Sequence, residues 1–273
     1  MNWYLKLICL FLFGVQFISV CDAQECKARN YTFREGEELI YIVSYNWFII
    51  WTDVGEVTFT VKSSEYKDNP AYHYMGVGKT FKSWDWIFSV YDKYQCYVNP
   101  LTLKPYYFKR EVKEGNFRQL VTYEYNFDNN TAVSDFKVND NPLRQDTVPI
   151  SSCTFDVMSG MLFSRNIDFT SYEVGDTIPI TIILDQKLYH IYFRYLGIED
   201  RKIKHVGKFE CIKFSIMLVE GTVFNEGEDM MVWVTNDKNR MPIYAESPIL
   251  VGSVKVRIAD VKGNRYPFTS LRK

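Results

Sequence analysis

The chain has 273 residues, and its 32 lysines and arginines nearly balance its 33 aspartates and glutamates, which leaves a formal net charge of −1 at pH 7. This balance and the lack of a long basic run argue against a nucleic-acid partner. Aromatic residues make up 17% of the chain, led by 20 tyrosines and 20 phenylalanines, and such a bias favours β-sheets.

Residues 1–23 have the layout of a secretory signal peptide. Lys6 precedes an almost unbroken apolar run over residues 7–20, and Ala23 provides a small residue at the exit. The run is shorter than the about 20 apolar residues of a transmembrane helix, and no second such run follows. We therefore expect cleavage after Ala23, export to the periplasm of a Gram-negative bacterium, and no membrane span. An outer-membrane lipoprotein anchored at Cys21 is the alternative, although the preceding valine is bulky for that signal.

Two alternating segments follow the signal peptide and predict a pair of strands. In residues 38–45 (ELIYIVSY) and 54–62 (VGEVTFTVK), apolar side chains recur at every second position. The connection between them, residues 46–53, holds the unbroken apolar run WFIIW where a polar turn is expected. These side chains are either buried by the rest of the protein or available for a ligand.

Further alternating segments follow, separated by turn sequences such as KEGN, DNN and NDKN. Segments this frequent, with almost no helical crossover, predict an all-β fold with a predominantly antiparallel sheet, as a flattened barrel or a two-sheet sandwich. The segments are residues 71–77, 87–98, 105–112, 117–126, 131–138, 177–184, 189–195, 209–218, 230–234, 243–246 and 251–258.

One segment near mid-chain has helical spacing. Residues 152–165 (SCTFDVMSGMLFSR) place Phe155, Met158 and Leu162 at intervals of three and four, with Ser152 or Thr154 available as a cap. We expect one short helix laid against a sheet or across the end of a barrel. No linker rich in Gly, Ser or Pro interrupts residues 24–273, so we predict a single β domain, with two sheet halves joined near residues 140–170 as a variant.

Four cysteines remain after the signal peptide, and they lie far apart in the sequence: Cys26, Cys96, Cys153 and Cys211. No C-x-x-C pair occurs, so a zinc site has no support. An exported chain can form up to two disulfides from four cysteines, with three alternative pairings, and buried free thiols are the other interpretation.

The sequence offers no catalytic, metal or cofactor motif. The segment GVGKT, residues 76–80, lacks the earlier glycine and the strand–loop–helix context of a phosphate-binding loop. His73, His190 and His205 stand alone in strand-like runs, so we expect none of them to be a metal ligand or a base.

Three carboxylates lie near turns or a helix start: Asp156, Asp185 and Asp237. A carboxylate-dependent hydrolase would need two such groups facing one cleft. We expect Asp237, in TNDKNRMP, to be a hairpin-turn residue that hydrogen-bonds its own backbone.

The order of the segments resembles a known family. GEELIYIVSYN, VGEVTFTV, FDVMSGMLFSR, GKFECIKF, MVWVTNDKNRMPIY and VGSVKVRI together resemble exported bacterial proteins grouped as domain of unknown function 3108 (DUF3108), and the aromatic richness is similar to members from the Bacteroidetes. The likeness spans residues 33–258. Its most specific parts are Gly36, Glu37, Gly55, Glu56, Trp233, Asp237, Arg240, Pro242 and Gly252.

The resemblance implies an envelope protein with a mostly antiparallel β fold of the flattened-barrel or sandwich kind. The family brings no established activity, so no catalytic residue is carried over. One departure from the family is the 46–53 connection, which is longer and more aromatic than the compact turn expected there.

A second aromatic segment, KSWDWIF, accompanies that connection. If the two meet at one rim of the sheet, they form an aromatic mouth suited to an acyl chain, a glycan ring or a peptidoglycan fragment. The alternative is that they plug the open end of a barrel or pack one sheet on the other. The candidate ligand-binding residues are Trp47, Phe48, Trp51, Trp84, Trp86 and Phe88.

The leading functional hypothesis is a non-enzymatic envelope protein that binds a lipid-like or glycan ligand or a protein partner. A carboxylate-dependent hydrolase acting on glycans is the second hypothesis, and a purely structural envelope component is the third.

Overall fold

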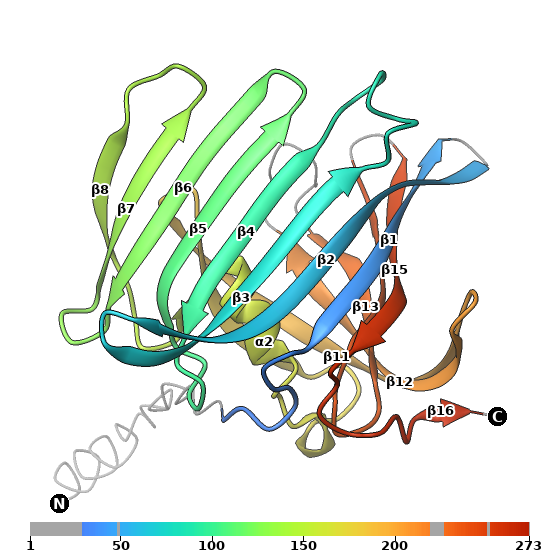
Figure 1. Cartoon of the computed structure of the whole chain (residues 1–273). Helices are drawn as coiled ribbons and strands as arrows, with labels where there is room; N and C mark the ends of the chain where they lie inside the picture. The colour runs from blue at the N-terminus through green and yellow to red at the C-terminus, as the bar shows by residue number, and fades with distance from the viewer. Residues whose placement is uncertain (1–28, 48–49, 219–226, 250–251, 273) are drawn as a thin grey trace, which may run out of the picture.

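The computed structural model describes residues 29–47, 50–218, 227–249 and 252–272, and within them the chain forms one large β-sheet (Figure 1). Its strands are β1 (Glu38–Trp47), β2 (Ile50–Tyr66), β3 (Asn69–Thr80), β4 (Tyr91–Val98), β5 (Pro105–Glu114), β6 (Phe117–Asn126), β7 (Thr131–Val138), β8 (Arg144–Pro149), β9 (Thr154–Phe155), β10 (Thr177–Leu184), β11 (Lys187–Ile203), β12 (Gly207–Leu218), β13 (Gly227–Thr235), β14 (Pro242–Pro248), β15 (Ser253–Lys262) and β16 (Leu271–Arg272).

The strands follow one path across the sheet, in the order β8-β7-β6-β5-β4-β3-β2-β1-β15-β14-β13-β12-β11-β10-β9, while β16 pairs with β12. Apart from the parallel pair β9 and β10, the described neighbours run antiparallel, joined mostly by hairpins. Strands β8 and β9 form the two edges of this path, so the sheet is not closed. The prediction of an all-β, mainly antiparallel fold is confirmed, and the sheet is a single curled one.

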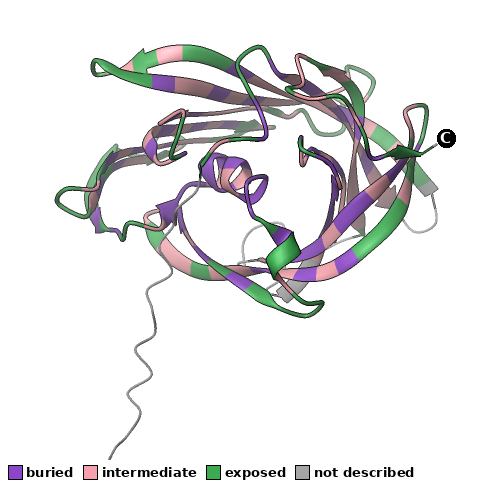
Figure 2. Ribbon diagram, turned by 90° about the horizontal axis from the view of Figure 1, so that it is seen from below, coloured by how far each residue is buried: buried purple, intermediate pink, exposed green. Residues whose placement is uncertain are grey.

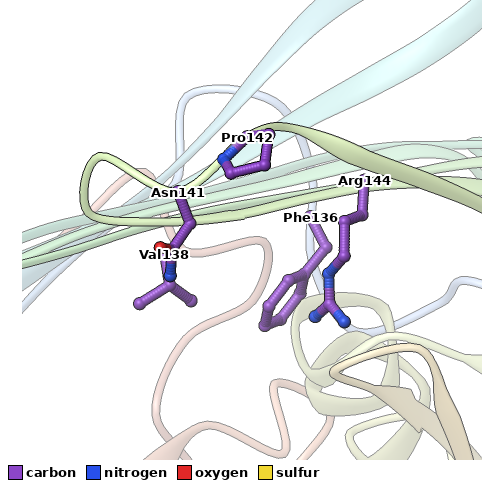
Figure 3. Close-up of a pocket in the computed structure, with 5 residues that line it drawn as sticks. All are labelled: Phe136, Val138, Asn141, Pro142 and Arg144. Atoms are coloured by element: carbon purple, nitrogen blue, oxygen red, sulfur yellow. The ribbon is translucent and has the colours of Figure 1, made fainter.

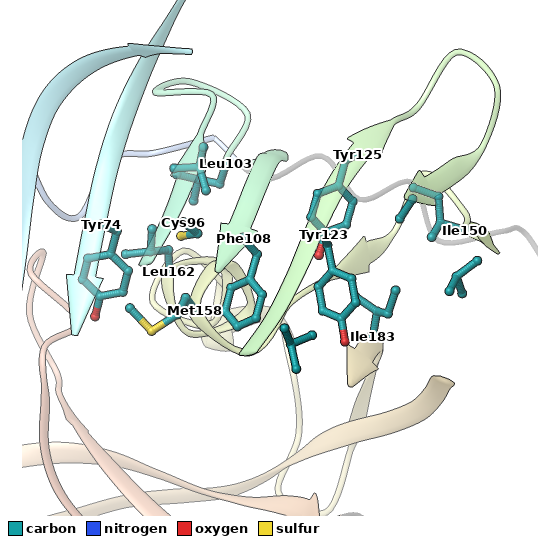
Figure 4. Close-up of a cluster of buried hydrophobic side chains, with 14 of the residues drawn as sticks. Tyr74, Cys96, Leu103, Phe108, Tyr123, Tyr125, Ile150, Met158, Leu162 and Ile183 are labelled. Atoms are coloured by element: carbon teal, nitrogen blue, oxygen red, sulfur yellow. The ribbon is translucent and has the colours of Figure 1, made fainter. Parts of the chain in front are cut away.

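Helix α2 (Val157–Ser164) lies inside the curl, where Figure 2 shows the sheet wrapping around it. It contacts β4 on one side and β9 and β10 on the other. Met158 and Leu162 pack into a core with Tyr74, Phe108 and Tyr123 from the long front strands (Figure 4). A small central helix therefore fills the space that a curled sheet alone would leave empty.

The predicted helix is present, but its predicted caps are wrong. The N-cap is Asp156, whose carboxylate accepts hydrogen bonds from the backbone N–H groups of Met158 at 2.8 Å and Ser159 at 2.9 Å. Thr154 belongs instead to β9, and Ser152 lies in the turn before it. Asp156 is the cap in place of Ser152 or Thr154 because its carboxylate accepts from two amide groups at the helix start that have no partner within the helix.

The 46–53 segment is not the long connection that the sequence suggested. Its described residues belong to strands β1 and β2, whose register pairs Asn46 with Trp51 and Trp47 with Ile50. Trp51 is therefore a residue of β2, near the end at which β2 pairs with β1.

Other strand limits also differ from the sequence prediction. β8, β9 and β16 were missed, because short or mostly polar edge strands carry little alternation. β4 begins at Tyr91 and leaves residues 87–90 in a loop, while β11 continues past Tyr195 to Ile203. This extension positions the side chains described next.

Candidate functional site

A hollow of about 330 Å³ opens beside the paired ends of β1 and β2. We call it the basic hollow, because five of its lining side chains are cationic and one is a carboxylate. Its lining residues are Ser44, Trp51, Asp53, Arg201, Lys202, Ile203, Lys204, Tyr244, Lys255 and Arg257.

The register of β1, β2 and β15 places one group of these side chains together. Ser44 lies opposite both Asp53 and Lys255 in the sheet. Cross-strand partners project from the same face. The alternation in VKVRI therefore brings Lys255 and Arg257 to the face that carries Asp53.

The remaining cations come from the far end of β11 and the turn after it. The register between β11 and β12 shifts between Tyr195 and Ile198, and Gly197 within this bulge has φ +96°. Such a bulge bends and twists a strand pair. The hairpin of β11 and β12 curves upward at the right of Figure 1, and residues 201–204 reach the hollow.

Asp53 is held by Arg257 inside the hollow. The Arg257 guanidinium donates to both carboxylate oxygens of Asp53, at 2.9 and 2.7 Å, and Ser44 Oγ donates to one of them at 2.6 Å. The hydrogen bonds from Arg257 lower the pKa of Asp53, with a smaller contribution from Ser44. Asp53 therefore stays ionised and orients Arg257. Arg201 pairs with Glu246 at 3.6 Å, so Lys202, Lys204 and Lys255 are the cations of the hollow that form no salt bridge with another described residue.

Aromatic rings form part of the wall. Lys255 Nζ lies 3.6 Å from the centroid of the Trp51 ring, and the Arg201 guanidinium lies 3.9 Å from the Tyr244 ring. Arg201 also stacks on Trp233, which is almost fully buried. Burial raises the pKa of Tyr244 to about 12, so its ring stays neutral. The hollow thus combines positive charge with apolar ring surface.

Beside the hollow, residues 81–90 form the connection between β3 and β4, which we call the aromatic loop. The Trp84 indole donates to the Asp53 carbonyl oxygen at 3.2 Å, and the Phe81 amide donates to the Val54 carbonyl at 2.9 Å. The two aromatic segments of the sequence therefore meet at one end of the sheet. Trp86, by contrast, is 82% exposed, and Phe88 is 53% exposed.

The six predicted ligand-binding residues separate into three groups. Trp51 lines the basic hollow, and Trp84 ties the aromatic loop to β2. Trp86 and Phe88 project from that loop into solvent, so they are not core residues. Phe48 lies outside the described residues, as does the side chain of Trp47.

The cations of the hollow were not identified as site residues from the sequence. They come from strands far apart in the chain: Ser44 and Arg257 are separated by 213 positions and are hydrogen-bonded at 3.0 Å. The local signal was the alternation of Lys255 with Arg257 and of Lys202 with Lys204, which indicates an outward face. It gives no indication that the two faces meet.

A second hollow, of about 370 Å³, lies under the β7–β8 hairpin (Figure 3). Phe136, Val138 and Pro142 give it an apolar lining, and the Arg144 guanidinium stacks 4.9 Å from the Phe136 ring. It presents a single charged side chain. Because ligand sites combine apolar walls with several convergent polar groups, the basic hollow is the stronger candidate.

The three carboxylates considered for hydrolysis have separate structural roles. Asp156 caps α2, and Asp185 forms an ion pair with Arg110. Asp237 accepts from the Asn239 amide at 2.9 Å and from Ser270 Oγ at 2.7 Å, so its predicted role in a turn is confirmed.

A different acidic pair, Asp92 and Glu114, lies at the base of the aromatic loop, where the Lys113 amide donates to Asp92 at 2.9 Å and Val90 pairs with Glu114. Burial raises both pKa values, and for Glu114 the neighbouring Asp92 adds to the effect. Neither side chain lines either of the two hollows.

The histidines and cysteines provide no metal site in the described part of the chain, where no group of three or more ligating side chains occurs. His73 stacks on Tyr97, while His205 lies in the β11–β12 turn at φ +66° rather than in a strand as expected.

Among the cysteines, Cys153 is disulfide-bonded, whereas Cys96 and Cys211 are buried free thiols. A second disulfide is therefore not formed by Cys96 or Cys211. Cys26 lies outside the described residues, as do Cys21 and the predicted signal peptide. No helix in the described ranges has the length and hydrophobicity to cross a membrane.

Several residues that carry the resemblance to DUF3108 meet in the core instead of at a hollow. Arg165 forms a salt bridge with Glu37, and both side chains are 1% exposed. Its Nη2 atom donates to Glu37 Oε2 and to the Asn239 carbonyl oxygen, each at 3.0 Å. This buried cluster joins the start of β1, the end of α2 and the β13–β14 turn. Its position indicates a structural role.

Comparison with known families agrees with the resemblance. The family model described as "Protein of unknown function (DUF3108)" matches residues 40–259. The chain belongs to this family. No curated protein matches the chain. Among solved structures, it is similar to a β-barrel-like protein of the domain of unknown function DUF1849 from Brucella abortus, with a TM-score of 0.55 and 7% sequence identity over 83% of this chain and 96% of that chain. At this identity the likeness supports the fold alone.

Proposed function

We propose that this DUF3108 protein is a non-enzymatic binding protein, and that its basic hollow takes an anionic ligand with an apolar ring or chain. The observation that carries the proposal is the convergence of five cationic side chains with the Trp51 and Tyr244 rings around one hollow. Cations complement a phosphate, sulfate or carboxylate group, and aromatic rings provide contact area for the apolar part of the ligand.

The charges of the hollow favour an anion over a neutral glycan or lipid. Asp53 is already paired with Arg257. Lys202, Lys204 and Lys255 form no salt bridge with another described residue, and Lys204 is exposed at the entrance. Like charges held together repel each other, so an anion that binds among them relieves this repulsion as well as gaining its own contacts.

We place this activity in the periplasm of a Gram-negative, Bacteroidetes-like bacterium, with an outer-membrane lipoprotein anchored at Cys21 as the alternative. The signal-peptide pattern of residues 1–23 supports export. The disulfide at Cys153 is in keeping with an oxidising compartment, because disulfides persist there and are rare in the cytosol.

Two fluorescent probes test the proposal, because they share a ring system and differ in charge. Anilinonaphthalene sulfonate carries an anionic group, whereas N-phenylnaphthylamine does not. We expect the wild-type protein to bind the sulfonate more tightly. Replacing two lysines of the hollow (Lys204→Gln with Lys255→Gln) should weaken binding of the sulfonate about tenfold, the scale of one or two charge-assisted hydrogen bonds, and leave the neutral probe unaffected.

Trp51→Ala should weaken both probes, because both use the ring surface. The matched control is Lys62→Gln with Lys137→Gln, two exposed lysines outside the hollow, which should change neither affinity. Equal affinity of the wild-type protein for the two probes, or unchanged sulfonate binding by the Lys204 and Lys255 variant, would refute the proposal.

A further inference from the structure

The aromatic loop presents its apolar side chains outward. Trp86, Ile87 and Phe88, which we call the tip, are 82%, 53% and 53% exposed. Figure 1 shows the connection between β3 and β4 rising above the end of the sheet. Tyr91 at the start of β4 and Phe117 at the start of β6 are also exposed. Large exposed apolar groups clustered at one place mark a contact surface.

The backbone of the loop is fixed in this conformation. The Ile87 and Phe88 amides both donate to the Trp84 carbonyl, at 2.9 and 3.1 Å. Thr80 Oγ1 donates to Asp85 at 2.7 Å, and the Trp84 indole ties the loop to β2. A tip held in this way presents its side chains without a large loss of conformational entropy on binding.

The shape of the tip favours a broad surface over a small ligand. Small-molecule sites are concave, and neither described hollow is lined by Trp86, Ile87 or Phe88. A projecting Trp beside an aliphatic and a second aromatic side chain suits the interface of a bilayer, where an amphipathic indole lies among lipid headgroups and apolar groups insert below them.

The charges around the tip fit an anionic bilayer. Lys82 lies within the loop, Lys113 Nζ lies 6.0 Å from the Tyr91 ring, and Arg118 donates to the Gly115 carbonyl beside Phe88. None of these three cations forms a salt bridge with another described residue.

The acids near the tip are Asp85, Asp92 and Glu114. Asp92 accepts a hydrogen bond from the Lys113 amide at 2.9 Å, and burial raises the pKa of both Asp92 and Glu114. Asp85 is the remaining acid of the loop. Basic residues around an apolar anchor add electrostatic attraction to anionic lipids.

We propose that the tip docks on the surface of an anionic lipid bilayer, with the Trp86 indole among the headgroups and the Ile87 and Phe88 side chains inserted below them. This inference does not depend on the basic hollow, because binding at the hollow is tested separately with small probes in solution. The protein would attach peripherally, and the rim of the sheet beside the basic hollow would face the membrane.

The test is co-sedimentation with vesicles. We expect the wild-type protein to sediment with vesicles of equal parts phosphatidylglycerol and phosphatidylethanolamine, and far less with pure phosphatidylcholine, with a blue shift of tryptophan emission on binding. Trp86→Ser combined with Phe88→Ser should reduce the apparent affinity about tenfold or more, since two large apolar anchors are lost.

The control is Val174→Ser with Leu101→Ser, which removes two apolar side chains of similar exposure, one before β10 and one between β4 and β5, and should leave vesicle binding unchanged. The Lys204 and Lys255 variant separates the two proposals. If it abolishes sedimentation while the tip variant binds like wild type, the hollow and not the tip contacts lipid, and the inference is wrong. Failure of the wild-type protein to bind anionic vesicles also overturns it, as would be expected if the tip binds a protein partner.

Discussion

Removing the charge of Glu37 should cost this fold more stability than almost any other conservative change. In Glu37→Gln the side chain keeps its shape, but the Arg165 guanidinium loses its counterion while both positions stay 1% exposed. A buried charge left without its partner costs about 3–5 kcal/mol. We expect this loss because the two remaining contacts of Arg165, the Asn239 carbonyl and the Phe33 ring, carry no full negative charge.

The assay is equilibrium unfolding in urea followed by tryptophan fluorescence. The neighbouring residue supplies a matched control: Glu38 pairs with Lys262 at 2.7 Å on the surface, and Glu38→Gln should change the midpoint little. The double replacement Glu37→Leu with Arg165→Met should destabilise less than Glu37→Gln alone, because no unpaired charge stays buried. A loss below about 1 kcal/mol for Glu37→Gln, the range of exposed pairs, would refute the reasoning.

Three further predictions follow from single residues. Burial raises the pKa of Asp156 from 3.8 to about 6. The stability that its protonated carboxyl group contributes is therefore fully present below pH 3.8 and is lost as the pH rises through about 6. Asp156→Asn, which keeps the helix cap, should remove this part of the pH dependence in unfolding titrations. The pKa of Asp168 is lowered chiefly by hydrogen bonds from Thr170, so the stability that Asp168 contributes should be lost as the pH falls instead of as it rises. Equal pH profiles for Asp168→Asn and Asp156→Asn would contradict both assignments. Gly252→Ala should lower the melting temperature far more than Gly175→Ala. Both glycines have positive φ, but a Cβ at Gly252 would lie 2.2 Å from the Asn46 carbonyl oxygen, whereas a Cβ at Gly175 would meet open space. Similar losses for the two variants would show that the hairpin shifts freely. Cys96 and Cys211 should resist maleimide labelling until the protein is unfolded, since both are fully buried, and rapid labelling of either in the native protein would show that its strand opens.

Much of the fold could be predicted from local sequence. In segments such as VGEVTFTVK, side chains alternate between core and surface, and this period of two is a direct consequence of strand geometry. Helix α2 was predicted for the same reason, from apolar residues at a period near 3.6. The segments that escaped prediction, such as β8 with its mostly exposed residues, lie at an edge where one face is not tied to the core.

The candidate site could be predicted only in part. Tryptophans in two short windows drew attention to one end of the sheet, and Trp84 does join the two windows. The charged residues around these tryptophans could not be predicted from the sequence. The bulge at Gly197 decides where Arg201 and Lys204 lie, and a bulge has no clear signature in the alternation of apolar residues.

The sequence by itself determined the β class, the central helix and membership of DUF3108, because each depends on short periodic segments and their order. The tertiary structure alone decided which charged residues meet. Glu37 and Arg165 are 128 positions apart and Asp53 and Arg257 are 204 positions apart, yet each pair is in contact. Electrostatic and hydrogen-bond partners are set by distance in space. That distance depends on how the sheet curls, which the alternation within each strand leaves undetermined.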